Sequence, residues 1–138
     1  MASRNTVLTG LLLALGVAVP VVLAVEAAHQ ATCDRECLIA ATGGYLDAML
    51  QHNPAALKVA ADVRVTENGK AVPLGEGLWK NAKAIPSRQA FADPSTGEAG
   101  FFGVVTEENG QRAQLAVHLK IQGQRIEEIE TLVSPEVR

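Results

Sequence analysis

The two cysteines of the chain, Cys33 and Cys37, are the side chains whose spacing most directly indicates chemistry. Residues four apart on a helix lie on the same face at about 6 Å, close to the upper limit of the Cα separation in disulfides. Free thiols and redox or metal chemistry are the alternatives, although a metal site would need further ligands. We expect a disulfide, which would fix the start of a helix.

A carboxylate near the C-terminus is the second candidate for chemistry. A two-residue turn at Gln122-Gly123 would place Glu130 opposite Leu115, on the apolar face of the preceding strand. A buried carboxylate is costly unless it has a partner, and burial raises its pKa toward the range useful for acid or base catalysis. We therefore take Glu130 as a candidate general base, supported by Tyr45 or Asp93, with a turn-forming role as the alternative for Asp93.

One extra residue in the last strand would reverse this arrangement. Such a β-bulge would turn Ile129, Thr131 and Val133 inward and Glu130 outward. The two registers make opposite predictions for one side chain. Glu130 directed inward, toward Tyr45, favours catalysis, and Glu130 directed outward favours binding or assembly.

His118 and the phenylalanines of the predicted strand 98–106 indicate a surface for association. A two-residue turn at Asn109-Gly110 would place Phe102 on the apolar face and Phe101 beside His118 on the other face. Aromatic side chains exposed in this way often mark association surfaces. We expect His118 on the surface or at a dimer interface, and the chain is a candidate homodimer.

The side chains expected around a ligand are mostly apolar. Tyr45 could direct its hydroxyl toward a ligand and Trp79 could close the mouth of a pocket, with ordinary core packing as the alternative for both. The predicted ligand-binding residues are Trp79, Phe102, Leu115 and Val117. Phosphate loops, nucleophile elbows and metal-spaced ligand clusters are absent from the sequence, so we expect no cofactor and no metal.

The order of the predicted elements is helices first and strands afterwards. A helix is expected from Cys33, capped by Thr32, to about Gln51, and a short second helix starts at Asn53-Pro54 and continues to about Val59. Asn68-Gly69 predicts a type I′ hairpin, and residues 78–84 a short helix or turn. Further strands are expected over residues 85–91, 98–106, 111–121 and 124–133. The predicted class is α+β, with N-terminal helices packed on a curved, mainly antiparallel sheet.

The first 28 residues differ from the rest of the chain in composition, because they are mostly apolar and nearly uncharged. Arg4 precedes an uncharged apolar run over Val7–Val25, which is typical of a signal peptide, with cleavage after Ala24 or Ala27. We expect a secreted or periplasmic protein, with an uncleaved membrane anchor as the alternative. The net charge is −3, from 15 acidic and 12 basic residues, which argues against the dense basic patch of a nucleic-acid binder.

Several segments together resemble known domains. They are Cys33-Asp34-Arg35-Glu36-Cys37, Thr66-Glu67-Asn68-Gly69, Leu74-Gly75-Glu76-Gly77-Leu78-Trp79, Phe91-Ala92-Asp93-Pro94 and Gly100-Phe101-Phe102-Gly103-Val104-Val105. In these segments the chain is similar to a group of small exported bacterial and fungal domains of uncharacterised function. The order of elements resembles the nuclear transport factor 2-like (NTF2-like) superfamily, which includes SnoaL-like polyketide cyclases, scytalone dehydratase and ketosteroid isomerase. The stretch 125–132 resembles the last strand of SnoaL-like domains.

The resemblance covers roughly residues 33–134 and implies a single α+β domain with a cone-like fold, an apolar pocket and often a dimer. The chain lacks a residue-by-residue match to the acid–base pairs of the isomerase or to the paired histidines of the dehydratase, so the resemblance assigns no catalytic residue. We expect an exported domain that binds a small apolar molecule between sheet and helices. The alternative is a cofactor-independent isomerase, dehydratase or cyclase.

Overall fold

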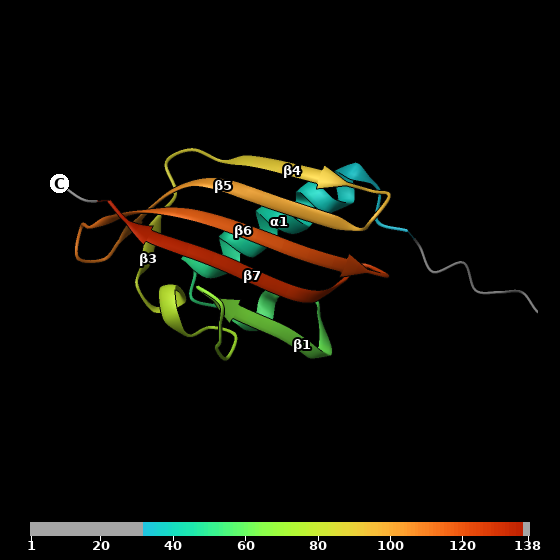
Figure 1. Ribbon diagram of the computed structural model, residues 1–138, viewed down its shortest axis with the longest axis horizontal. Helices are drawn as coiled ribbons and strands as arrows, with labels where there is room; N and C mark the ends of the chain where they lie inside the picture. The colour runs from blue at the N-terminus through green and yellow to red at the C-terminus, as the bar shows by residue number, and fades with distance from the viewer. Residues whose placement is uncertain (1–31, 137–138) are drawn as a thin grey trace, which may run out of the picture.

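The computed structural model describes residues 32–136, in which one α-helix lies across a strongly curved sheet (Figure 1). The helix is α1 (Arg35–Leu50), and two short 3-10 helices, η1 (Pro54–Ala56) and η2 (Gly77–Lys80), lie in the connections. None of the helices in this range is long and apolar enough to cross a membrane. The strands are β1 (Val59–Glu67), β2 (Lys70–Ala71), β3 (Ala82–Ala84), β4 (Gln89–Asp93), β5 (Glu98–Glu107), β6 (Arg112–Gln122) and β7 (Arg125–Pro135).

The seven strands form one sheet in the order β2-β1-β7-β6-β5-β3, and β4 also pairs with β5. The β1–β7 pair is parallel and the other pairs are antiparallel. A mainly antiparallel sheet with a helix on its inner face confirms the predicted α+β class. The signal peptide predicted for residues 1–28 lies outside the described residues.

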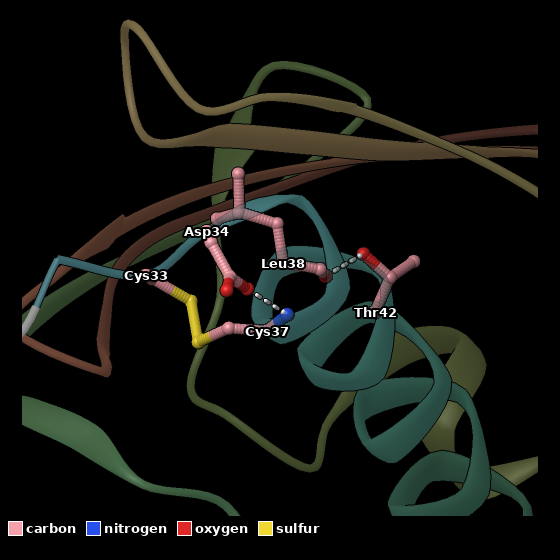
Figure 2. The surroundings of a disulfide bond; sticks show 5 residues. All are labelled: Cys33, Asp34, Cys37, Leu38 and Thr42. Carbon is pink, nitrogen blue, oxygen red and sulfur yellow. Dashed lines mark hydrogen bonds between the residues drawn. A yellow bond between two sulfur atoms is a disulfide. The ribbon is translucent and has the colours of Figure 1, made fainter.

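The start of α1 confirms the disulfide and corrects the predicted cap. Cys33 and Cys37 are bridged, with their Cα atoms 5.2 Å apart (Figure 2). The cap is Asp34 rather than Thr32, because its carboxylate accepts a hydrogen bond of 2.9 Å from the Cys37 N–H. A carboxylate is favoured there because it also complements the positive end of the helix dipole.

The predicted second helix is shorter than expected. Only the single turn η1 forms, because β1 already begins at Val59, where it pairs with Ile126 of β7. The hairpin at Asn68-Gly69 is confirmed, and both residues have the positive φ angles, 49° and 76°, that a type I′ turn requires.

The register of β7 follows the bulged alternative. The turn consists of Gly123 and Gln124, one residue later than predicted. Ile121 then pairs with Ile126, but Lys120 pairs with Glu128, so that Glu127 is the extra residue. Beyond this bulge, Ile129 and Thr131 are buried on the inner face of the sheet, and Glu130 lies on the outer face.

The predicted register of β5 is wrong by one residue. The Gly110 N–H donates a hydrogen bond to the Glu107 carbonyl, and the Glu107 N–H donates one to the Gln111 carbonyl. Three residues, 108–110, instead of two therefore connect the paired ends of β5 and β6. An odd shift exchanges the two faces of a strand. Phe101 is therefore buried, whereas Phe102 is 55% exposed on the outer face.

The core fills the space between α1 and the inner face of the sheet. Within it the rings of Tyr45 and Trp79 pack edge to face, with centroids 5.5 Å apart. The other large, fully buried side chains of the core are Leu38, Leu46, Met49, Leu115, Leu119, Ile129 and Val105.

Candidate functional site

The structure does not bring the three predicted catalytic side chains together. Tyr45 lies in the core, where its hydroxyl accepts a hydrogen bond of 3.1 Å from the Trp79 indole N–H. Burial raises the pKa of Tyr45 to about 12, although the bond from Trp79 opposes this shift. The phenol therefore stays protonated even at pH 10, and its hydroxyl is part of the core packing.

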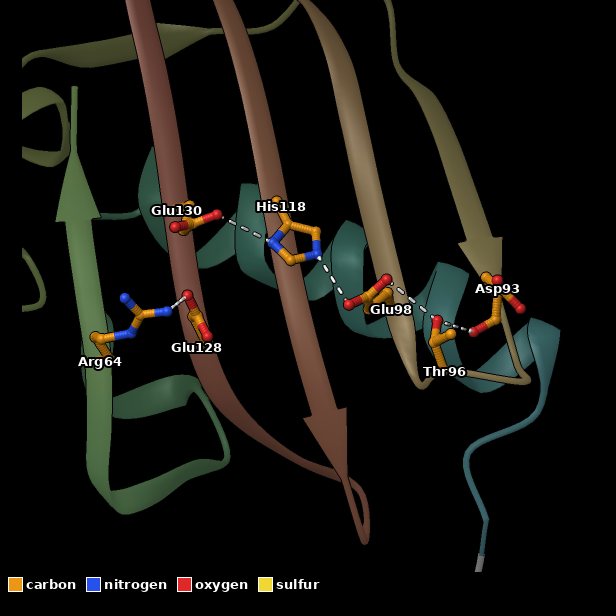
Figure 3. Close-up of polar contacts among 7 residues, drawn as sticks. All are labelled: Arg64, Asp93, Thr96, Glu98, His118, Glu128 and Glu130. Atoms are coloured by element: carbon orange, nitrogen blue, oxygen red, sulfur yellow. Dashed lines mark hydrogen bonds and ion pairs between the residues drawn. The ribbon is translucent and has the colours of Figure 1, made fainter. Parts of the chain in front are cut away.

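Glu130 and Asp93 lie on the face of the sheet that is turned away from α1, the helix that carries Tyr45 (Figure 3). The Asp93 carboxylate accepts hydrogen bonds from the Ser95 hydroxyl (2.6 Å) and the Ser95 N–H (2.9 Å), and these bonds lower its pKa. This is the turn-forming arrangement that the sequence offered as the alternative. The catalytic roles stay predictions, with Glu130 directed outward.

A row of polar side chains crosses the outer face at Glu130. His118 Nδ1 is 3.4 Å from a Glu130 oxygen, and His118 Nε2 is 3.9 Å from a Glu98 oxygen (Figure 3). All three side chains are more than 40% exposed, so solvent screens these contacts and each contributes at most about 1 kcal/mol. Two hollows of about 220 and 270 Å³ lie beside His118.

A neighbouring row carries alternating charge across the same face. Lys120 pairs in register with both Glu98 and Glu128, and Arg64 of β1 forms an ion pair with Glu128. Within residues 32–136, no group of three or more His, Cys, Asp or Glu side chains could hold a metal ion. The outer face is thus a solvated polar surface beside the exposed side chains of Phe91, Phe102 and Leu132.

The predicted ligand-binding residues do not surround a common cavity. Trp79, Leu115 and Val117 are at most 4% exposed and belong to the core, and Phe102 lies outside on the opposite face. The expectation that Phe102 shares the apolar face is therefore wrong, because the three-residue connection shifts β5 by one position.

A cavity exists elsewhere, between the first turns of α1 and the turn of the β6–β7 hairpin. Its volume is about 300 Å³, at the lower end of the range for small-molecule sites. The disulfide forms part of its wall, and α1, η1 with the residues after it, and the hairpin supply the rest. The lining residues are Cys33, Cys37, Ala40, Ala41, Gly44, Ala56, Leu57, Lys58, Ile121, Gln124 and Ile126.

The cavity arises because α1 presents small side chains to this part of the sheet. Cys37, Ala41 and Gly44 recur at helical spacing, so one face of the helix carries no long side chain. A Cβ atom built on Gly44 would have no neighbour within 4 Å. The same stripe was visible in the sequence, but only the position of the hairpin shows that the space beside it stays open.

A second, more polar hollow of about 440 Å³ adjoins this cavity. The two share Leu57, Lys58 and Gln124, and Arg125 lines the second hollow. No acidic residue lines either of them. The apolar cavity therefore opens beside two cationic side chains.

Comparisons with known proteins agree with this fold. A family model described as a domain of unknown function (DUF8021) matches residues 31–133. No curated protein sequence is significantly similar to the chain. Solved structures of similar fold include a protein of unknown function with a cystatin-like fold from Methylobium petroleophilum PM1, 15% identical, which covers 78% of this chain and 82% of that chain with a TM-score of 0.62.

An NTF2-like protein of unknown function from Burkholderia xenovorans LB400 is 10% identical, with coverage of 75% of this chain and 87% of that chain and a TM-score of 0.54. A de novo designed protein with a curved β-sheet is 18% identical, with coverage of 74% and 88% and a TM-score of 0.60. These similarities confirm the NTF2-like fold. At such low identity they show the fold alone, and a fold does not specify an activity.

Proposed function

The chain belongs to the family described as a domain of unknown function (DUF8021). We propose from the geometry that it is an exported domain, which binds a small apolar molecule in the cavity between α1 and the β6–β7 hairpin. The observation that carries this proposal is the cavity of about 300 Å³ beside the disulfide. Cavities of this kind, with apolar walls and few polar groups, are typical of small-molecule sites.

The size of the cavity limits the ligand. At the roughly 30 Å³ that one water molecule occupies in the liquid, the cavity holds about ten non-hydrogen atoms. Burial of an apolar group contributes about 0.8 kcal/mol for each methylene. A chain or ring system of this size would gain up to about 8 kcal/mol if it were fully buried, and this gain offsets the cost of association.

Export is the second part of the proposal. The disulfide supports it, because disulfides form and persist mainly in secreted and periplasmic proteins. The apolar run over Val7–Val25 supports it as well, because it has the composition of a signal peptide.

The experiment compares two glycine variants of the exported protein. Gly44→Leu places a side chain in the open space of the cavity, whereas Gly43→Leu is a matched control, because Gly43 also has free space but does not line the cavity. Both replace a helix glycine, which favours the helix by about 1 kcal/mol. Apolar molecules retained through native purification are extracted and identified by mass spectrometry, and decanol binding is measured by calorimetry.

We expect the unmodified protein and Gly43→Leu to retain the same apolar compound and to bind decanol, and Gly44→Leu to lose both properties. Equal binding by the two variants, or no binding of any apolar compound by the unmodified protein, would contradict the proposal.

An isomerase, dehydratase or cyclase stays the alternative prediction. Its test is Glu130→Gln. An enzyme that uses Glu130 as its base should lose turnover in this variant while its fold stays intact. The outward direction of Glu130 favours binding over catalysis.

A further inference from the structure

The charges around the cavity bear on the class of ligand, and this inference rests on the proposed binding function. Lys58 lines both the apolar cavity and the polar hollow beside it, and Arg125 lines the polar hollow. Neither forms an ion pair with any residue in the described range 32–136. Within that range, two cations without carboxylate partners therefore lie beside the apolar cavity.

The combination matches an amphiphile in size and polarity. Apolar walls favour an alkyl chain, whereas an anionic headgroup is favoured in a hollow that contains Lys58 and Arg125 and no acidic residue. A cationic headgroup would be repelled there, and a neutral one would gain only hydrogen bonds, for instance from the Gln124 amide. We infer that the ligand is a single-chain amphiphile with an anionic headgroup, its chain in the cavity beside the disulfide and its headgroup between Lys58 and Arg125.

Three probes with the same ten-carbon chain separate the headgroup from the chain. Decanoate and decyltrimethylammonium, each below its micelle concentration, and decanol, below its solubility limit, are titrated into the exported protein. We expect decanoate to bind most tightly and the trimethylammonium compound most weakly. Removal of one methylene from decanoate should weaken binding about fourfold if the chain is buried. Added salt should weaken the binding of decanoate and leave that of decanol unchanged.

Charge variants locate the headgroup. Lys58→Gln should weaken the binding of decanoate about two- to fivefold, which is the range for one solvent-exposed ion pair. The binding of decanol should stay unchanged. The double variant with Arg125→Gln should lower the affinity for decanoate further, toward that of decanol. Lys70→Gln is the matched control, because it removes the same charge from β2, outside both hollows.

The outcomes distinguish this inference from the proposed function. Decanol that binds as tightly as decanoate, or an effect of Lys70→Gln equal to that of Lys58→Gln, would overturn the anionic headgroup and leave the apolar site intact. Absence of binding by all three probes would overturn both the anionic headgroup and the proposed apolar binding site. Binding of decanoate only when it is presented in phosphatidylcholine vesicles would also overturn the inference, because it would show a membrane surface rather than a free amphiphile as the ligand.

Discussion

Gly77 is a position where one added methyl group is expected to lower stability and to test a specific side-chain contact. Its φ is +65°, a left-handed conformation that costs a residue with a side chain about 1–2 kcal/mol. A Cβ atom there would also lie 2.6 Å from both carboxylate oxygens of Glu67. This carboxylate accepts a hydrogen bond of 2.9 Å from the Leu78 N–H, which holds the turn that carries Trp79.

Gly77→Ala must displace that carboxylate. The loss of a hydrogen bond to a charged group costs about 1.5–3 kcal/mol, so together with the backbone strain we expect a loss of about 3 kcal/mol in the free energy of unfolding. Gly69→Ala is the control: its φ is +76°, but a Cβ atom there has no neighbour within 4 Å, so it should lose only about 1 kcal/mol. Urea unfolding followed by Trp79 fluorescence measures both values. Equal losses for the two variants would show that the Glu67 contact has no energetic role.

Three further predictions concern the core, the disulfide and the outer face. Because burial raises the pKa of Tyr45 to about 12, the folded protein keeps a proton that the unfolded chain releases near pH 10. The free energy of unfolding should therefore fall by about 2 kcal/mol between pH 10 and 12. Urea unfolding measures this fall, which the Tyr45→Phe variant should lack. Replacement of both cysteines of the Cys33–Cys37 disulfide by alanine should lower the free energy of unfolding by about 2 kcal/mol, because the closed loop is short, and a loss above 4 kcal/mol in thermal or urea unfolding would refute that estimate. If the exposed row of Phe102 and Leu132 joins two copies, sedimentation velocity should show a dimer that Leu132→Glu converts to a monomer; an unmodified protein that is monomeric at all concentrations would exclude the dimer.

Local signals in the sequence predicted much of the fold. The Asn68-Gly69 turn, the disulfide and the last three strands follow from residue types and spacing, because each depends on neighbours in the chain. The connection between β5 and β6 could not be predicted in the same way. Asn109-Gly110 suits a turn of two residues or of three, and one residue decides which face Phe101 and Phe102 occupy.

The bulge in β7 did leave a signal. Ile126 and Ile129 are three residues apart, and strict alternation would put them on opposite faces, so the pair of glutamates between them indicates an extra residue. The only signal of the cavity in the sequence is the stripe of small residues Cys37, Ala41 and Gly44, because the opposite wall of the cavity comes from residues 121–126, which are distant in the chain. The predicted pocket residues Trp79, Leu115 and Val117 have the right polarity but fill the core.

The unpaired Glu127 has an evolutionary consequence. A chain that lost this one residue would alternate strictly from Ile126 onward, so every later side chain would keep its present face and its present neighbour on β6. Related domains that differ in length by this one residue would therefore keep their acidic positions on the solvent side. Only a strand of the present length that paired without the bulge would carry an interior carboxylate, so the pairing of this strand is more informative about an acid–base role than the presence of a glutamate at any one position.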